Sequence, residues 1–290
     1  MTRLFIVGDS FSVPPKPEDK TRETWTHLVH QGLIDHTGSE VKYVNCSLMG
    51  SSQEWAWKFL QLWLDGECTP DDYVIVCLTH PSRVWYFEDN PALTNANIVD
   101  LDDHVTPEQA RAVELYLKHI QRPEIDIQNV NNRMAYVAYQ VMKRGLRRPL
   151  FIKCFRQEMA QSSEWPEINL AKGVLMDDVQ YWEFEDPDMD IDAKYWNGLD
   201  CRYNHMCLSN HRILADKILE SFRTDTTPDL TEGFQRGLLT WQCLTDREFC
   251  RRELDLFTLD HNQKFRQKFA PKLPWAKRVG VVTGQHVRPE

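Results

Sequence analysis

Short, continuously apolar runs alternate along most of the chain with longer segments in which apolar residues recur every three or four positions. The short runs predict buried β-strands, and the longer segments predict amphipathic helices. The predicted strands cover residues 3–7, 42–47, 73–78, 150–155 and 179–184. Strands that alternate with helices predict a mainly parallel sheet with helices on both faces, an α/β three-layer sandwich of the flavodoxin-like type.

Local start signals and apolar spacing place the helices more closely. The tetrapeptide Thr-Pro-Glu-Gln at residues 106–109 has an N-cap, a proline at the first helical position and a glutamine that closes a capping box. Ser51 and Glu54 have the same spacing, so a helix is predicted to begin directly after Gly50. The residues expected on the inner faces of four helices are Trp25, Leu28, Val29 and Leu33; Trp55, Phe59 and Leu62; Val130, Met134, Val137 and Val141, ending near Gly145; and Leu214, Ile218 and Phe222, following Ser209.

Residues 224–290 depart from this alternation of strands and helices. Their apolar spacing predicts two helices, marked by Phe234, Leu238, Trp241 and Leu244 and by Phe249, Leu254 and Phe257. The chain is therefore predicted to consist of a domain of residues 1–223 and a mostly helical, basic C-terminal extension of residues 224–290. The extension is expected to pack on the domain or to form homo-oligomer or other assembly contacts.

Charge is unevenly spread along the 290 residues. The whole chain carries −9, but residues 261–290 carry +6, which leaves −15 on the rest. Broad nucleic-acid binding is not expected from this balance; the basic segment is either a solvated arm or a contact for an acidic surface. No apolar run approaches a membrane span and no signal-peptide pattern stands at the N-terminus, so the expected location is cytoplasmic. The eight cysteines lack CxxC spacing and are expected to be reduced.

Polar residues follow three of the predicted strands at the point where each strand ends. Gly-Asp-Ser at residues 8–10 follows the first strand, Gly50 follows the second, and Thr79 and His80 follow the third. The carboxyl ends of parallel strands meet at one edge of the sheet, where ligands bind in folds of this class. Ser10 at the tip of a buried strand and His205, just before the last helix of the domain, are the two halves of a nucleophile–base pair.

Over residues 3–222 these blocks resemble the SGNH (GDSL-type) hydrolase family. Residues 8–10 are similar to the family's nucleophile motif, and the turn at 45–52 is similar to the one whose glycine, here Gly50, donates a backbone N–H. His205, followed by His211 inside the helix start, is similar to the late histidine block. The resemblance implies Ser10 as nucleophile, His205 as base, and the N–H groups of Ser10 and Gly50 as oxyanion donors.

The third block departs from the family pattern. The family ends its third strand with Gly-x-Asn, and the asparagine donates to the oxyanion, whereas here His80 occupies that position. An imidazole can still donate a hydrogen bond. We therefore expect His80 to complete the oxyanion hole, with Arg83 as an alternative donor and Asp9 and Thr79 as supporting residues.

The fourth block departs as well. The family has an aspartate three residues before its histidine, and here that position is Arg202, with Asp200 two residues further back. Either Asp200 orients His205 through a shifted loop, or a backbone carbonyl orients the ring, or the site is weakened. A misoriented base costs orders of magnitude in rate while the serine stays in place.

The expected function is a serine esterase or deacylase that hydrolyses a carboxylic ester, with an acylated carbohydrate as the substrate class suggested by analogy and by the ten tryptophans. The alternative is a catalytically weak or inactive SGNH-fold protein used for binding or assembly, such as a virion structural protein. Some phage-encoded proteins of this type resemble the Gly-Asp-Ser-Phe start and the Asn-His late block, which implies a virion or host-cytoplasm setting.

No cofactor and no metal are expected. The Cys/His spacing between residues 201 and 211 fits no zinc module, and the alternating aspartates of residues 186–192 lack the glycine of a calcium loop, with Ile191 in its place. A phosphate-binding turn at residues 8–10 has no GK[ST] or GxGxxG motif beside it.

Overall fold

The computed structural model describes residues 1–13, 24–48, 50–66, 68–81, 83–84, 106–155, 165–175, 206 and 208–234. Within these residues five strands form one parallel sheet in the order β2-β1-β3-β4-β5. The strands are β1 (Arg3–Val7), β2 (Lys42–Asn45), β3 (Tyr73–Leu78), β4 (Leu150–Lys153) and β5 (Asn169–Leu170). This is the flavodoxin-like strand order, and it confirms the predicted parallel α/β sheet.

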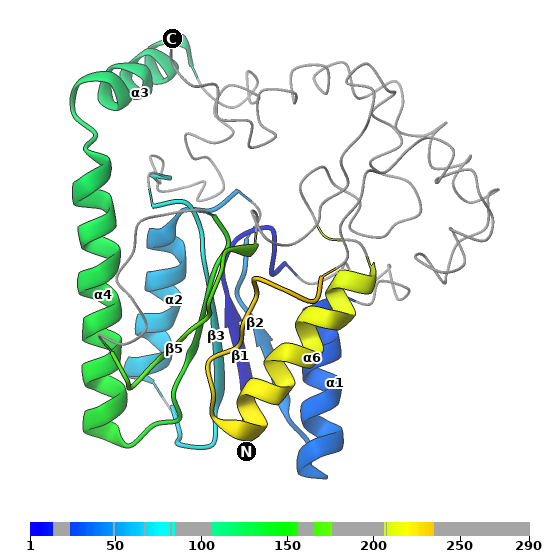
Figure 1. The fold of residues 1–290 in the computed structure, drawn as a ribbon. Coiled ribbons are helices and arrows are strands. Elements are labelled where there is room, and N and C mark those ends of the chain that lie inside the picture. Colours follow the sequence, from blue (N-terminus) through cyan, green and yellow to red (C-terminus); the bar gives the residue numbers. More distant parts are fainter. Residues whose placement is uncertain are drawn as a thin grey trace, which may run out of the picture.

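Helices cover both faces of the sheet (Figure 1). The described helices are α1 (Trp25–Thr37), α2 (Gln53–Asp65), α3 (Pro107–His119), α4 (Pro123–Arg144) and α6 (Leu208–Thr224). One face is covered by α1 and α6, which contact each other, and the other by α2 and α4. The described part of the chain thus has the three layers that the sequence pattern predicts.

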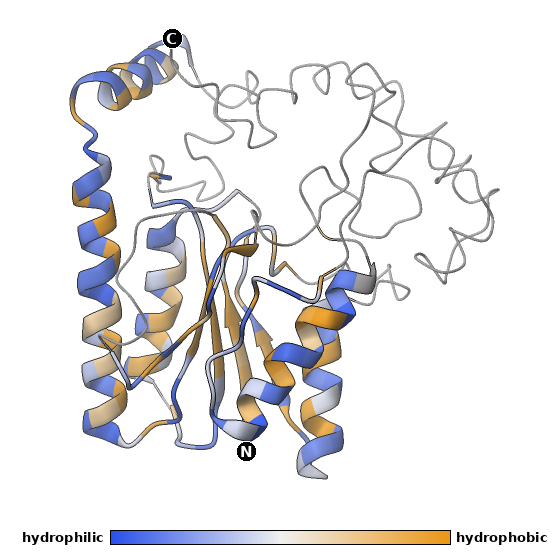
Figure 2. Ribbon diagram, viewed as in Figure 1, coloured by the Kyte–Doolittle hydropathy of each residue, from blue (hydrophilic) through white to orange (hydrophobic). Residues whose placement is uncertain are grey.

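Alternation along the strands supplies a separate core for each face. In β1, Leu4 and Ile6 belong to the cluster beneath α1 and α6, whereas Phe5 and Val7 belong to the cluster beneath α2 and α4. Every residue of β3 is buried, because this central strand is covered on both faces. Figure 2 shows apolar strands at the centre, between helices that carry both polar and apolar residues.

Most predicted elements are present. The first four predicted strands correspond to β1–β4, and the capping box at Thr106 and Gln109 starts α3 as expected. The residues expected on the inner face of α4 are buried. The helix ends at Arg144, and its C-cap, Gly145, has a left-handed backbone conformation. The predicted strand at 179–184 and the helices after Phe234 lie outside the described residues. The short edge strand β5 was not predicted, because two residues leave no pattern.

The prediction for α2 was wrong in its start and in its buried face. Ser52 is the N-cap, and the Ser51 hydroxyl donates to the Gly8 carbonyl instead of capping the helix. The buried residues are Gln53, Ala56, Trp57, Leu60, Trp63 and Leu64. Leu62 is exposed, and Trp55 and Phe59 are only partly buried. Apolar residues occur all around this helix, so periodicity alone did not decide which stripe packs on the sheet.

The segment after α6 contacts the chain just after β5 and the core beneath α1 and α6. The backbone of Lys172 accepts from Leu230 N and donates to Pro228 O, at 2.9 and 3.0 Å. Leu230 and Phe234 are buried in the cluster beneath α1 and α6. The segment after α6 therefore packs on the same core up to residue 234, and the division at residue 223 stays a prediction.

The described residues also bear on the expected state of the cysteines and on the expected lack of a membrane span. The four cysteines among them (Cys46, Cys68, Cys77 and Cys154) are free thiols, and the latter two are buried. None of the described helices is long and apolar enough to cross a membrane.

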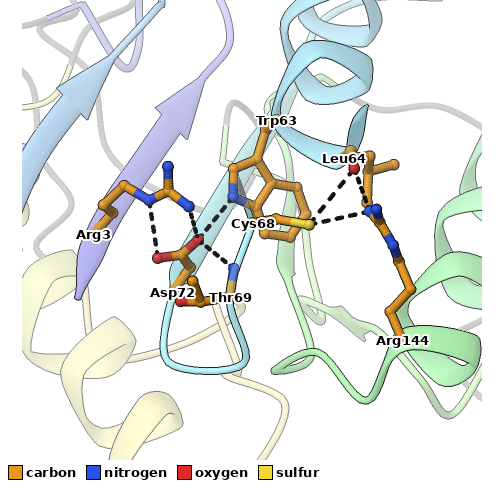
Figure 3. A network of polar contacts seen from close by, with 7 residues as sticks. All are labelled: Arg3, Trp63, Leu64, Cys68, Thr69, Asp72 and Arg144. Atoms are coloured by element: carbon orange, nitrogen blue, oxygen red, sulfur yellow. Dashed lines mark hydrogen bonds and ion pairs between the residues drawn. The ribbon is translucent and has the colours of Figure 1, made fainter. Parts of the chain in front are cut away.

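At the amino ends of β1 and β3, a buried carboxylate gathers four donors (Figure 3). Arg3 donates to both oxygens of Asp72, from Nε at 3.1 Å and from Nη2 at 2.8 Å. Trp63 Nε1 and Thr69 N donate to Oδ2 at 3.1 and 3.0 Å. This network fixes the end of the sheet that lies opposite the turns discussed below.

Candidate functional site

The chain order reverses between β1 and β3, because β2 lies on one side of β1 and β3 on the other. In open parallel sheets ligands bind at such a switch point, in the crevice outside the carboxyl ends of the strands. Four turns meet there: the serine turn at 8–12 after β1, the β2 turn at 45–48 and 50–52, the β3 turn at 79–81 and 83–84, and residues 154–155 after β4.

The serine turn lies so close to β3 that its first residue, Gly8, has no room for a side chain. A Cβ on Gly8 would lie 2.5 Å from Cys77 Cβ and 2.6 Å from Ser12 Oγ. The N–H and the hydroxyl of Ser12 both donate to the carbonyl of Asp9, at 3.0 and 3.1 Å. Ser10 lies half-buried on this turn, between the fully buried Asp9 and the buried Phe11. A serine is thus presented directly after a buried strand.

Asp9 ties the serine turn to the β3 turn. Its Oδ1 accepts from Phe11 N at 3.2 Å, and its Oδ2 accepts from Arg83 Nη1 at 3.1 Å. The same Arg83 nitrogen donates to Thr79 Oγ1 at 2.9 Å. Arg83, predicted as an alternative donor, therefore contacts both Asp9 and Thr79, which were predicted as supports. The carboxylate is fully buried and the Arg83 side chain is 17% exposed, so this ion pair is largely shielded from water.

Phe155 lies among these turns and was not singled out from the sequence. The Arg83 guanidinium stacks over its ring at 4.6 Å. Phe11 and His80 meet the same ring edge-on, with centroids 5.7 and 6.1 Å away. An aromatic residue at the end of the fourth predicted strand was the available signal. Its ring contacts side chains from the serine turn and from the β3 turn and so holds the two turns in fixed relative positions.

The β2 turn is bonded to the serine turn through backbone and side-chain groups. Asn45 Nδ2 donates to Ser12 O at 2.7 Å, and Leu48 N and Ser51 Oγ both donate to Gly8 O, at 3.0 and 3.2 Å. Gly50 has φ +72°, a conformation that favours glycine. The structure thus brings the turn that carries Gly50 against the turn that carries Ser10.

Gln53, the first residue of α2, was also missed from the sequence. Its Oε1 accepts from Thr79 N at 3.0 Å, and the side chain is buried. The carboxamide therefore lies against the end of β3, beside the residue that binds Arg83.

Two thiols lie beneath the serine turn, Cys77 on β3 and Cys154 directly after β4. Burial raises the pKa of Cys154 well above its usual value, and a hydrogen bond with Cys77 and the charge of Asp9 raise it further. A neutral, buried thiol is a poor nucleophile. Ser10 is therefore a better candidate nucleophile at this edge than Cys154.

His205 and Asp200 lie outside the described residues. Met206, which follows His205 in the chain, is buried in the same cluster as Phe11, which follows Ser10. His211 in the first turn of α6 accepts from Trp25 N through Nδ1 at 3.3 Å, and Trp25 Nε1 donates to Phe11 O at 2.7 Å. The start of α6 is thus joined to the serine turn through Trp25.

The chemistry of the described edge is therefore polar and largely hydrogen-bond donating. It combines a serine hydroxyl, an imidazole, a paired guanidinium and the uncapped first turn of α2. Among the described residues no group of three or more His, Cys, Asp or Glu side chains is placed to hold a metal ion.

Comparisons with known proteins give little more. No family model and no curated protein matches the chain. Among solved structures, one match is LAE5, an α/β hydrolase enzyme from the metagenome of Lake Arreo, Spain. The two chains are 12% identical, and the match covers 80% of this chain and 96% of that one with a TM-score of 0.38. A similarity at this level carries no information about the function of this chain.

Proposed function

We propose that this protein is a serine hydrolase of the SGNH type, an esterase or deacylase that cleaves a carboxylic ester, with an acylated carbohydrate as the substrate class. The observation that carries the proposal is the position of Ser10. It lies half-buried on a tight turn at the β1/β3 switch point, and that turn is bonded to the β2 turn that contains Gly50.

The contacts of their chain neighbours support a pairing of His205 with Ser10. Phe11 and Met206 each stand one residue from the proposed partners, and both are buried in the cluster beneath α1 and α6. Consecutive Cα atoms are about 3.8 Å apart. The burial of both neighbours in one cluster supports the proposed pairing.

In the proposed reaction His205 removes the proton from Ser10 Oγ as that oxygen attacks the ester carbonyl carbon. The N–H groups of Ser10 and Gly50, with the ring of His80, donate to the oxyanion of the tetrahedral intermediate. His205 then protonates the leaving alcohol, and water repeats the sequence to release the acid and restore Ser10. Asp200 is the proposed partner that orients the imidazole.

The Asp9–Arg83 pair has an electrostatic role in this proposal. Asp9 is buried directly beside Ser10, and an unpaired carboxylate there would oppose the negative charge that develops on the substrate oxygen. Arg83 balances that charge at 3.1 Å. Arg83 already donates to Asp9 and Thr79. It is therefore a poor substitute for the oxyanion donor that the third block lacks, where His80 stands in place of asparagine.

That engagement of Arg83 also favours a second candidate function, a weak or inactive SGNH-fold protein used in binding or assembly. Because Arg83 is paired with Asp9, His80 is the remaining candidate for the oxyanion donor of the third block, and its ring lies edge-on to Phe155. Loss of one oxyanion donor lowers the rate by about 10²–10³.

An active-site phosphonate probe separates the two functions. A fluorophosphonate should label the wild-type protein on Ser10, and labelling should be lost in Ser10→Ala and in His205→Ala. Ser39→Ala, an exposed serine in the loop after α1, is the matched control and should label normally. Absence of labelling in folded wild-type protein, together with no turnover of short-chain aryl esters, would support the binding function instead.

A further inference from the structure

Buried polar atoms without partners gather where α2 begins. Among the described residues, Ser47 Oγ, Ser52 Oγ and Gln53 Nε2 have no hydrogen-bond partner although each atom is shielded from solvent. Ser52 and Gln53 are 1% and 2% exposed. Leaving a buried donor unpaired is costly, and such groups are expected to meet a ligand or water. The three atoms lie in one short segment at the edge of the sheet that carries Ser10.

The orientation of the Gln53 carboxamide is set by chemistry. Its Oε1 accepts from Thr79 N at 3.0 Å, and a backbone N–H can only donate. The other end of the same planar group is therefore the NH₂. A pair of N–H donors is thus held rigidly beside the first residue after β3.

The surroundings of this NH₂ favour a negatively charged oxygen. Gln53 opens a 13-residue helix whose N-cap, Ser52, makes no side-chain capping bond, so first-turn N–H groups and the positive end of the helix dipole face the same region. Arg83 binds Thr79, the residue that Gln53 also binds. Glu54, in the first turn, is exposed and is the acidic side chain of that turn.

The same segment is joined to the serine turn. Ser51 Oγ, two residues before Gln53, donates to the carbonyl of Gly8, two residues before Ser10. Thr79, bonded to Gln53, is linked through Arg83 to Asp9. The carboxamide therefore lies in the ring of hydrogen bonds that holds the serine turn in place.

We propose that Gln53 supplies the side-chain amide donor of the oxyanion hole. In the SGNH pattern an asparagine of the third block makes this contribution, and here His80 stands in its place. This inference rests on the proposed function. A donor that is already desolvated and fixed in orientation stabilises a developing charge more than a solvated one, because little reorganisation is needed. Gln53 is then a catalytic residue with two tasks: Oε1 accepts from Thr79 N, and Nε2 donates to the oxyanion.

Gln53→Glu separates those tasks, since the carboxylate still accepts from Thr79 N but cannot donate. We expect kcat on a short-chain aryl ester to fall by about 10²–10³-fold with KM little changed. The ratio of variant to wild-type kcat should rise as the pH falls, because the introduced carboxyl regains an O–H donor when protonated. Gln53→Met, which removes both tasks, and His80→Ala are measured beside it, with thermal unfolding as the check on folding.

Each outcome decides the matter. If wild-type protein turns over ester and Gln53→Glu keeps its rate while Gln53→Met loses it, Gln53 is only an anchor for Thr79, and the inference fails while the function stands. If wild-type protein neither labels nor turns over ester, the proposed function fails and the inference falls with it.

A measurement on wild-type protein covers the case in which the variants do not fold. Glutamine side chains are labelled with ¹⁵N, and the Gln53 NH₂ is assigned from its contact with the Thr79 amide. Phosphonylation of Ser10 should shift this NH₂ resonance downfield and slow its exchange with solvent. An unchanged Gln53 signal in fully phosphonylated protein would overturn the inference.

Discussion

Gly8 sits so close to β3 that one added methyl group would collide with Cys77 and Ser12. Gly8→Ala should therefore destabilise the domain by about 1–3 kcal/mol through overpacking. Gly38→Ala is the control, because Gly38 has open space around its Cα and is constrained only by φ +63°, which costs an alanine about 1–2 kcal/mol. Urea unfolding measures both.

The two glycine variants also differ in where the effect is felt. The Gly8 change should lower labelling of Ser10 by the phosphonate probe, since it displaces the turn that carries the serine, whereas the Gly38 change should not. Normal labelling in a folded Gly8→Ala protein would contradict the close approach of the turn to β3.

Arg83 balances a carboxylate that has no access to solvent. Arg83→Met should cost about 3–5 kcal/mol, because it leaves a buried charge unpaired. Urea unfolding at neutral pH measures this loss.

The double variant Asp9→Asn/Arg83→Met provides the cross-check. It buries no charge at this place, so it should be more stable than Arg83→Met alone. A double variant as unstable as the sum of the two single variants would show that the two side chains do not act as a pair.

At the scale of the elements, the Asp72 network joins the amino ends of β1 and β3 to the end of α2 (Figure 3). Burial raises the pKa of Asp72, but hydrogen bonds from Arg3, Thr69 and Trp63 and the charge of Arg3 outweigh it, so the net pKa is lowered. A lowered native pKa stabilises the folded state above the unfolded carboxyl's pKa of about 3.9, and this stabilisation is lost as the pH falls through the native value.

Asp72→Asn should therefore lose about 1.5–3 kcal/mol near neutral pH, from hydrogen bonds to a charged group. The difference from wild type should shrink as the pH falls below about 4, because the unfolded carboxyl takes up a proton there while the native carboxyl is protonated only at a lower pH. Urea unfolding from pH 7 to pH 2.5 tests this, with the exposed neighbour Asp71→Asn as the control. A difference that does not change with pH would mean that the carboxylate charge contributes nothing.

Elements also show where sequence reasoning works and where it stops. In α4, apolar residues at Val130, Met134, Val137 and Val141 stand against polar neighbours, and the predicted face is the buried one. In α2, apolar residues occur on every side, so the local pattern permitted two faces, and packing against β1 and β3 selected the one with Trp57, Leu60 and Leu64.

At the scale of the molecule, the segment after α6 completes the core beneath α1 and α6. Leu230 is fully buried there, and Lys217 lies 5.6 Å from the ring centre of Phe234. A protein truncated after residue 234 should unfold cooperatively with a stability close to that of the full chain. Truncation after residue 223 should cost about 2–5 kcal/mol, because it exposes the cavity that these side chains fill.

Circular dichroism with urea unfolding compares the two truncated proteins. The variant Leu230→Ala in the longer protein is the control. Equal stability of the two truncations would place the domain boundary at residue 223, as the sequence pattern suggested. A loss of folding in both would show that residues 235–290 are part of the same cooperative unit.

The sequence by itself determined the strands β1–β4, the helices, their order and hence the parallel α/β class, because apolar periodicity and helix caps depend on residues that are close in the chain. It also placed Ser10, Gly50 and His80 at one edge of the sheet, since the carboxyl ends of parallel strands must meet there. Only the tertiary structure decided that Asp9 binds Arg83, 74 residues away, and that Gln53 binds Thr79 across 26. Contacts between separate turns leave no periodic signal in the chain, because they depend on how the strands and helices pack in space.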